Sequence, residues 1–422
     1  MNVYELSLNR LRFCFREFDN VYVSFSGGKD SGVLLNLAIK VLDEFPGRKL
    51  GVLHLDYEAQ YQMTTDYVDE VFASDDKRLE FYRCCVPFCV PCTTSMKQSY
   101  WTPWNPEERD IWVRPMPKGA ITTLPYFKKG MWDYDFQSRF AGWYKEQHDG
   151  GSVCCLVGIR TQESLNRWRT IWSDDDRRRH YSGKQWTTDM GGGVVNAYPV
   201  FDWQTEDIWT ANARFGWTYN HLYDIFYQAG ITIDKMRVAS PFLGEGQDSL
   251  KLYRVIEPNT WGKMLGRVNG VNFTGIYGGT TAMGWKSIKL PKGHTWESYM
   301  YFLLDTLPRE TRANYLSKLK TSMKFWRERG GVMSADTIQR LRDAGVDIEV
   351  GTTTNYRTDK LPVRMDYIDD IDIPEFREIP TFKRMCVCIM KNDHLCKYMG
   401  FSQTKNEMER RKAIMEKYKA LL

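Results

Sequence analysis

The chain has 422 residues, enough for two domains, and its hydrophobic content of 42% is ordinary for a globular protein. A formal net charge of +5 is too small to identify a nucleic-acid-binding protein, although it is compatible with an anionic small substrate. We find no apolar run of transmembrane length, and residues 1–20 lack the apolar block of a signal peptide. These features favour a cytoplasmic protein and exclude a role inside a membrane.

The first predicted elements are a strand, a helix and a second strand. Val21 to Phe25 alternates apolar and polar residues, which predicts a strand. After a glycine turn, apolar residues recur at helical spacing from Val33 to Phe45, and Leu50 to Leu55 predicts the second strand. Because a helix joins them, we expect the two strands to be parallel, with a right-handed crossover.

Further elements follow at wider intervals. The pattern predicts a helix over Tyr61 to Phe72, a buried strand over Val153 to Ile159 and a helix that begins at Thr205. The stretch from Tyr100 to Lys129 is rich in Pro, Trp and Lys and has no clean period. It indicates a long insertion beside the candidate ligand site described below.

The pattern changes beyond about Ser240. Helical patterns then cover Trp296 to Arg329 and Ser334 to Ala344, and a charged helix is predicted over 408–422. We therefore predict a nucleotide-binding domain over residues 1–240 and a mostly helical C-terminal region over 241–422.

The turn after the first strand reads Ser-Gly-Gly-Lys-Asp-Ser and suits phosphate binding. Its glycines let backbone N–H groups converge on phosphate oxygens, while the helix N-terminus and the lysine add positive charge. The spacing is neither that of a Walker P-loop nor that of G-x-G-x-x-G. The predicted phosphate-binding residues are Ser24, Ser26, Gly27, Gly28, Lys29, Asp30 and Ser31.

More candidate residues follow the ends of other predicted strands, where parallel sheets bind ligands. Asp56 is placed to meet a ribose, a base or Mg²⁺, although capping of the local backbone is an alternative. Gly158 and Arg160 follow the strand at Val153, with Arg167 close behind. Two guanidinium groups at a phosphate site can hold oxygens and stabilise developing charge.

Two groups of cysteines raise the question of metal or thiol chemistry. The first group, within nine residues, is Cys84, Cys85, Cys89 and Cys92. Adjacent cysteines seldom ligate one metal well, so we expect reduced, partly buried thiols here, with no zinc or iron–sulfur cluster. The second group, close to a lysine and a histidine that favour a thiolate, is Cys386, Cys388 and Cys396.

Several of these segments together resemble the 3'-phosphoadenylylsulfate (PAPS) reductase family and its PP-loop relatives, such as the small subunit of ATP sulfurylase. The matching segments, spread between Val21 and Ala229, are Ser26–Ser31, Asp56, Gly158–Arg160, Tyr198–Trp209 and Tyr219–Tyr223. The resemblance implies an α/β fold of the PP-loop (adenine nucleotide alpha-hydrolase-like) type, with a parallel sheet covered by helices on both faces. It also implies a place in sulfur metabolism.

Beyond that region the chain resembles the DUF3440 group, which includes IbrA- and YbdN-type proteins. The matching segments are Met236–Phe242, Val255–Trp261 and Arg267–Phe273. Members of this group often accompany a ParB-like protein, so the resemblance implies such a partner. The Glu-Cys-Gly-x-His motif that ends the reductases is absent from this chain. Its absence argues against sulfite-forming reduction.

We predict an enzyme of the ATP-pyrophosphatase type. It would bind ATP with Mg²⁺ and cleave it at the α-phosphate, with Lys29, Asp30 and Arg160 as catalytic residues and Asp56 orienting nucleotide or metal. One alternative is a thiol-dependent reductase of PAPS or adenylylsulfate. Another is a nucleotide-sensing regulatory subunit that works with a ParB-like partner. The charged run from Asp174 to His180 would suit a nucleic-acid backbone, but a solvated surface explains it as well.

Overall fold

The computed structural model describes residues 2–172, 180–233, 236–243, 250, 252–272, 274, 290–352, 359–371 and 379–401. The helix predicted over 408–422 and residues 174–179 of the charged run lie outside this part. The chain forms two compact units. The first comprises Met1–Cys92 and Tyr100–Val271, and the second comprises Thr93–Ser99 and Asn272–Leu422.

A six-stranded sheet forms the centre of the first unit, with strand order β3-β2-β1-β6-β8-β7. The strands are β1 (Asn20–Ser24), β2 (Leu50–Leu55), β3 (Leu79–Cys84), β6 (Val153–Val157), β7 (Thr187–Gly191) and β8 (Val194–Ala197). All neighbouring pairs are parallel except β7 with β8. The three strands predicted from the sequence are therefore confirmed, and the antiparallel edge strand was not predicted.

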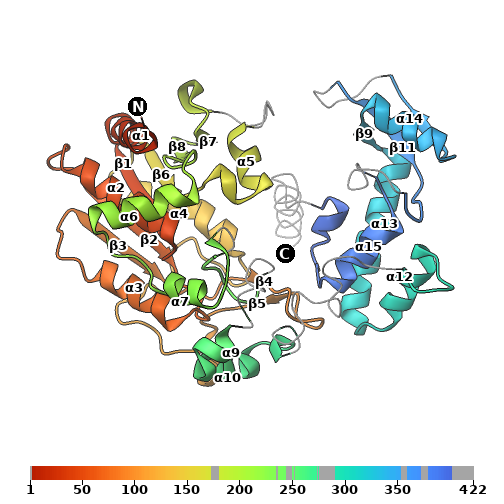
Figure 1. Cartoon of the computed structure of the whole chain (residues 1–422), viewed down its shortest axis with the longest axis horizontal. Helices are drawn as coiled ribbons and strands as arrows, with labels where there is room; N and C mark the ends of the chain where they lie inside the picture. The colour runs from red at the N-terminus through yellow and green to blue at the C-terminus, as the bar shows by residue number, and fades with distance from the viewer. Residues whose placement is uncertain are drawn as a thin grey trace, which may run out of the picture. The chain divides into compact units, whose positions relative to one another are not determined.

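Helices cover both faces of this sheet (Figure 1). The described helices of the first unit are α1 (Val3–Glu17), α2 (Lys29–Leu42), α3 (Gln62–Phe72), α4 (Asp133–Gln147), α5 (Leu165–Trp172), α6 (Thr205–Phe215), α7 (Leu222–Gln228), α9 (Tyr253–Ile256) and α10 (Pro258–Arg267), of which α9 and α10 lie away from the sheet. Alternate residues of β1 face opposite ways: Val21 and Val23 pack with α1, α2 and α6, whereas the Tyr22 ring lies 5.2 Å from that of Phe140 in α4. The predicted fold class is thus confirmed.

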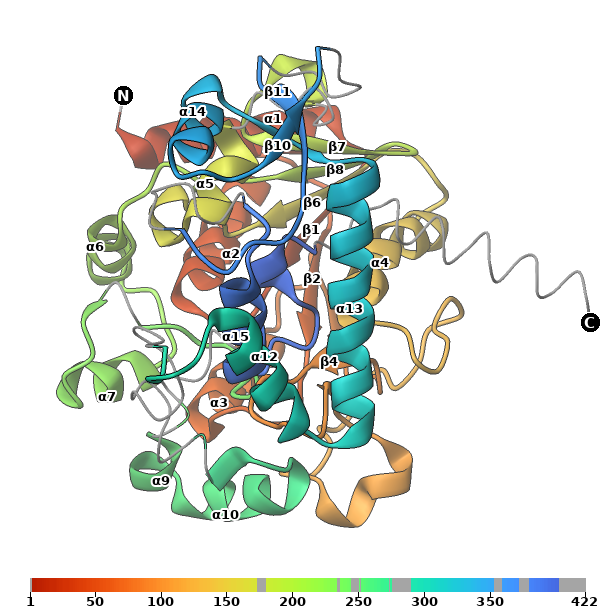
Figure 2. The same cartoon turned by 90° about the vertical axis from the view of Figure 1, so that its right-hand side faces the viewer.

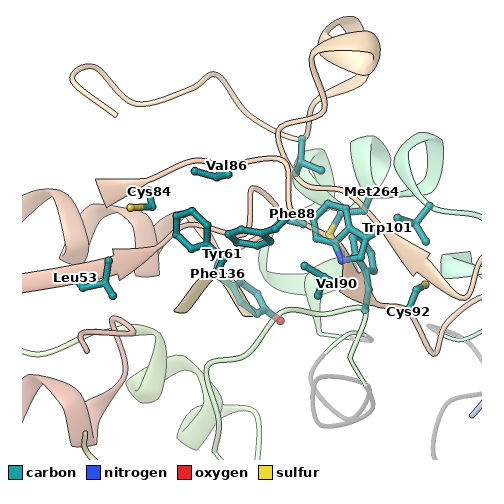
Figure 3. Close-up of a cluster of buried hydrophobic side chains, with 14 of the residues drawn as sticks. Leu53, Tyr61, Cys84, Val86, Phe88, Val90, Cys92, Trp101, Phe136 and Met264 are labelled. Atoms are coloured by element: carbon teal, nitrogen blue, oxygen red, sulfur yellow. The ribbon is translucent and has the colours of Figure 1, made fainter. Parts of the chain in front are cut away.

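The predicted insertion contributes to the core on the face of the sheet that α4 covers, where Trp101 joins the same cluster as Leu53 and Phe136. The insertion contains β5 (Tyr100–Trp101), which pairs with β4 (Val90–Pro91) before it, and the 3-10 helix η1 (Pro106–Ile111). Figure 3 shows side chains of this core, including some from β2 and α4. Phe88 and Trp101 lie among aliphatic and aromatic neighbours, together with the thiols of Cys84 and Cys92. These two cysteines are packing residues of the core.

The second unit is mostly helical, as predicted. Its helices are α12 (Trp296–Asp305), α13 (Arg309–Glu328), α14 (Ala335–Asp343), α15 (Phe382–Met390) and the 3-10 helix η7 (Lys397–Met399). Figure 2 shows α12, α13 and α15, which pack together around Met300, Leu319 and Met385. An antiparallel sheet of order β10-β11-β9 was not predicted; its strands are β9 (Gly331–Met333), β10 (Ile348–Val350) and β11 (Leu361–Met365).

The segment Thr93–Ser99 connects the two strands of the β4–β5 hairpin, yet it belongs to the second unit. Side chains from late in the chain bind its carbonyl groups. Asn392 Nδ2 donates to the Thr93 carbonyl at 3.2 Å, and His394 Nε2 donates to the Ser95 carbonyl at 2.9 Å. The second unit is therefore assembled from two separate stretches of sequence.

Candidate functional site

The predicted phosphate loop, Ser26–Ser31, joins the end of β1 to the first turn of α2. Gly27 has a φ of 74°, a left-handed conformation that glycine adopts without steric cost. Gly28 is the N-cap of α2, so the N–H groups of the first helical turn begin at this point. The loop therefore offers backbone donors and the positive end of a helix at the carboxyl edge of the sheet, where an anion binds favourably.

Serine hydroxyls fix the shape of this loop. The Ser26 N–H donates to Ser31 Oγ at 3.2 Å, and Ser31 Oγ donates to the Gly28 carbonyl at 3.0 Å. Ser24, at the end of β1, accepts a hydrogen bond from Gln137 Nε2 at 3.1 Å. The loop is thus closed onto its own helix by internal hydrogen bonds.

Lys29, Asp30 and Arg160 meet in one ion cluster. Lys29 Nζ lies 2.8 Å from Asp30 Oδ2, and Arg160 Nε lies 2.5 Å from Asp30 Oδ1. Burial alone would raise the pKa of the Asp30 carboxyl, but the two cations hold that pKa below its usual value. Burial lowers the pKa of the Lys29 ammonium, and Asp30 opposes this effect. Two nearly buried cations share one carboxylate, so the cluster carries a net positive charge beside the loop.

The end of β6 presses directly against this loop. A Cβ added to Gly158 would lie 3.1 Å from the Asp30 carbonyl carbon and 3.1 Å from the Ser31 nitrogen. These neighbours are backbone atoms, so no side-chain movement could relieve the contact. The absence of a side chain at Gly158 brings Arg160, two residues later, within reach of Asp30.

Two residues of α7 and its preceding turn complete the loop, and they were not among the predicted site residues. The Tyr223 hydroxyl accepts the Lys29 N–H at 3.2 Å, and its ring centroid lies 5.5 Å from Lys29 Nζ. Asn220 Nδ2 donates to the Gly27 carbonyl at 3.0 Å. Both lie in the Tyr219–Tyr223 segment, whose family resemblance was the only signal that pointed to them.

Asp56 ends β2 as predicted, but its carboxylate is already occupied. The side chain is fully buried, accepts from Arg83 Nε at 3.1 Å and pairs with Arg114 through its other oxygen. Burial would raise the pKa of this carboxyl, yet Arg114, His54 and Arg83 lower it to about 2. Asp56 therefore presents no unpaired oxygen toward the phosphate loop.

The ion pairs of Asp56 continue into a buried network that the sequence did not reveal. Glu58 is fully buried with a φ of 63°, and its carboxylate binds Arg267 at 2.8 and 3.1 Å. The backbone carbonyl of Glu58 accepts from Arg114 Nε at 2.9 Å, so Arg114 links the Asp56 carboxylate to the main chain of Glu58. This network anchors the insertion and α10 to the edge of the sheet.

Arg167 joins the cluster through Glu163, and its charge also helps to lower the pKa of Lys29. Its guanidinium pairs with Glu163, and Glu163 lies 3.6 Å from Arg160 Nη2. Arg167 thus belongs to the outer part of the ion cluster, one carboxylate away from Arg160. The structure brings Lys29, Asp30 and Arg160 together and places Arg167 behind them.

All ten cysteines are buried and none is in a disulfide. Burial raises the pKa of Cys386 to about 12 and raises the pKa of Cys388 well above its usual value. In the part of the chain that the structure describes, no group of three or more His, Cys, Asp or Glu residues is arranged to hold a metal ion. That the protein contains no zinc or iron–sulfur cluster stays a prediction.

The fold and the loop define an α/β protein of the PP-loop class. The family model "Phosphoadenosine phosphosulfate reductase domain" matches residues 20–105, and the model "Domain of unknown function (DUF3440)" matches residues 230–410. Over 416 residues the chain is 32% identical to "Uncharacterized protein YbdN" of Escherichia coli (strain K12), covering 96% of this chain and 92% of that protein. The chain therefore belongs to the PAPS reductase-like DUF3440 family that includes YbdN.

More distant likenesses cover only part of the chain. Sulfate adenylyltransferase subunit 2 of Pseudomonas putida (strain GB-1) is 25% identical over 209 residues, which are 48% of this chain and 59% of that protein. The PAPS reductase of Candida auris, solved as a phosphate complex, aligns with a TM-score of 0.30 at 14% identity, over 56% of this chain and 87% of that one. Candida glabrata FMN adenylyltransferase with ATP aligns with a TM-score of 0.30 at 12% identity, over 52% and 58%.

Within the described residues, every helix is too short or too polar to cross a membrane. A location in the cytoplasm, a ParB-like partner and a nucleic-acid ligand stay predictions.

Proposed function

We propose that this chain binds an adenine nucleotide at the Ser26–Ser31 loop and cleaves it at the α-phosphate, transferring the adenylyl group to a second substrate. The observation that carries the proposal is the ion cluster, in which Lys29 and Arg160 converge on Asp30 at the N-terminus of α2. Phosphate oxygens that enter the loop would meet two cations and a helix N-terminus, which stabilise the charge that develops on a departing pyrophosphate. The likeness to a sulfate adenylyltransferase subunit supports adenylyl transfer.

Each residue of the cluster has a separate role in this proposal. Lys29 and Arg160 neutralise the phosphate oxygens, while the backbone N–H groups of the loop bind them directionally. Asp30 holds the two cations in position when no nucleotide is bound. No side chain needs to act as a nucleophile, since the second substrate itself attacks the α-phosphate.

The described residues do not offer a set of ligands for a resident Mg²⁺ ion near the loop. Both carboxylate oxygens of Asp56 are bound by arginines, and Asp30 lies between two cations. We therefore propose that Mg²⁺ arrives with the nucleotide, coordinated by its phosphates, as part of the substrate.

Thiol-dependent reduction is the weaker of the two enzymatic alternatives. Attack on sulfur requires a thiolate, and burial raises the pKa of both Cys386 and Cys388 far above neutrality. Cys396 is also fully buried. These thiols are core residues of the second unit, so the adenylyl-transfer proposal accounts better for what the site contains.

The proposal is tested by replacing Lys29 with alanine and measuring nucleotide affinity by calorimetry. Loss of a charge-assisted contact costs about 1.5–3 kcal/mol, so ATP should bind about ten- to a hundredfold more weakly. The matched control is Lys129→Ala, because Lys129 is a surface lysine with 88% of its side chain exposed. Equal ATP affinity of the parent and Lys29→Ala would refute the loop assignment.

A second measurement separates catalysis from sensing. Pyrophosphate release from ATP, with candidate acceptors present, is expected from the parent chain and not from Arg160→Ala. ATP binding without any pyrophosphate release, across acceptors and with a ParB-like protein added, would favour the regulatory subunit instead. Sulfite release from PAPS with thioredoxin would overturn both in favour of the reductase.

A further inference from the structure

A pocket of about 390 Å³ lies in the first unit beside the phosphate loop. It is lined by residues of α6, of α7 and of the turn between them, with Ile233 and Met236 from beyond α7. Its principal lining residues are Trp209, Tyr219, Tyr223, Asp224, Tyr227 and Met236. Its volume is in the range of small-molecule sites. Tyr223 belongs to both places, because its hydroxyl accepts the Lys29 N–H and its ring lines the pocket.

Aromatic rings form the walls of this pocket at steep angles to one another. The Trp209 ring centroid lies 5.3 Å from that of Tyr219, with an interplanar angle of 82°. It lies 5.5 Å from that of Tyr223, with an angle of 73°. Tyr227 adds a fourth ring and is 66% exposed, which an ordinary core residue would not be. Trp209 packs edge-to-face against both Tyr219 and Tyr223, so the rings do not form one flat stack.

The described lining of the pocket contributes a negative charge, and the cation described above, Lys29 Nζ, lies 5.5 Å from the centroid of the Tyr223 ring. Asp224 is the only charged residue among its described lining residues, and 44% of its side chain is exposed. Its carboxylate is oriented by the Tyr219 hydroxyl, which donates at 3.1 Å, and by His221 Nδ1 at 2.9 Å. The described lining offers a carboxylate and neither lysine nor arginine, which disfavours an anion such as sulfate and favours a cation.

We propose that this pocket is an aromatic cage for an organic ammonium group. Faces of tryptophan and tyrosine attract cations through the ring quadrupole, and a carboxylate adds a Coulombic attraction. A quaternary or methylated ammonium matches both the apolar walls and the negative charge. The group is carried either by a small molecule or by a lysine side chain of a polypeptide. The proposal does not depend on nucleotide cleavage at the loop.

The test compares two ligands of the same shape that differ only in charge. Choline carries the quaternary ammonium, and 3,3-dimethylbutan-1-ol is its neutral isostere. We expect calorimetry on the full chain to give an affinity for choline at least about tenfold higher than for the alcohol. Equal affinities, or no binding of choline at millimolar concentration, would overturn the proposal.

Variants then locate the site. Asp224→Asn and Tyr227→Ala should each weaken choline binding by about tenfold, while Tyr301→Ala should leave it unchanged. Tyr301 is the matched control because it is an exposed tyrosine of α12 in the second unit, 46% accessible. Tyr227 is mostly exposed, so its truncation spares the fold. Choline affinity unaffected by both pocket variants would refute this location.

Two further measurements complete the test. The first identifies the source of the cation, and the second separates a failure of this proposal from a failure of the proposed function. A peptide with one trimethyllysine that binds at least about tenfold tighter than free trimethyllysine would identify a polypeptide ligand, and equal affinity would identify a small molecule. ATP affinity is measured on the same samples. Choline binding without ATP binding would refute the proposed function alone. ATP binding without choline binding would refute the aromatic cage alone.

Discussion

Replacing Gly158 by alanine tests how closely the end of β6 packs against the phosphate loop. The new Cβ would lie 3.1, 3.1 and 3.2 Å from backbone atoms of Asp30 and Ser31, whereas ordinary contact begins at 3.4 Å. The overlap is thus 0.2–0.3 Å against the first turn of α2, and it can be relieved only by moving backbone.

Overpacking of this kind typically costs about 1–3 kcal/mol. Alanine also reduces the entropy of the unfolded chain, which returns about 0.5 kcal/mol, because Gly158 does not need a positive φ. We therefore expect Gly158→Ala to lower the free energy of unfolding of the first unit by about 0.5–2.5 kcal/mol. The same displacement should weaken ATP binding, since it moves the N–H groups of the loop.

Gly142→Ala is the matched control. Gly142 lies inside α4, is exposed, and a Cβ there would meet no atom within 4 Å. Alanine in a helix interior should raise stability by about 0.5–1 kcal/mol, so the two substitutions should act with opposite signs. Urea denaturation followed by fluorescence measures both. A Gly158→Ala chain as stable as the parent, with ATP affinity unchanged, would show that β6 does not press on the loop.

Asp30→Asn should lower the free energy of unfolding by about 3 kcal/mol, because Lys29 and Arg160 lose their shared carboxylate. Pyrophosphate should nevertheless bind more tightly by calorimetry, and weaker binding would contradict the role given to Asp30. Burial lowers the pKa of His54, so its neutral form stabilises the fold above about pH 6.5 and this contribution is lost as pH falls. The free energy of unfolding from urea denaturation should therefore fall more between about pH 7.5 and 5.5 for the parent than for His54→Asn. An equal fall in both chains would refute this role of His54. A thiol reagent should modify no cysteine rapidly in the folded chain and all ten after denaturation; one fast-reacting native thiol would reopen the reductase alternative.

The phosphate loop could be predicted because its signals are local. The alternating strand, the glycines and the helical spacing all lie within about one strand and one helix, and β1, α2 and β2 follow that pattern. The partners of the loop could not be predicted, since they come from distant positions. Tyr223 contacts Lys29 across 194 residues of sequence, and Arg114 reaches Asp56 across 58. The sequence predicted correctly that Asp56 follows the end of a strand. Only the structure shows that Arg83 of β3 and Arg114 of the insertion pair with its carboxylate.

The C-terminal cysteines show the same limit. Nearby Lys391 and His394 indicated an activated thiolate, because sequence proximity was the only information available. In the structure Lys391 Nζ donates to the Tyr398 hydroxyl at 3.0 Å, and His394 donates to the Ser95 carbonyl. The thiols instead face the apolar core formed by α12, α13 and α15. The short strands of the second unit were missed because three to five residues are too few to show a period of two.

The segment Thr93–Ser99 has a consequence for how the chain is made. Its carbonyl groups bind side chains that lie up to 299 residues later in the sequence, as the hydrogen bond from Asn392 to Thr93 shows. At ribosomal rates of about 5–20 residues per second, that delay is about 15–60 s. The partners of the β4–β5 connection are made in turn during this interval: Thr274 donates to the Thr94 carbonyl across 180 residues of sequence, and Thr311 donates to the Met96 carbonyl across 215. No single cut of the polypeptide divides the two units. A truncation after Val271 would therefore keep the seven residues Thr93–Ser99 but remove the rest of the second unit, with which they pack.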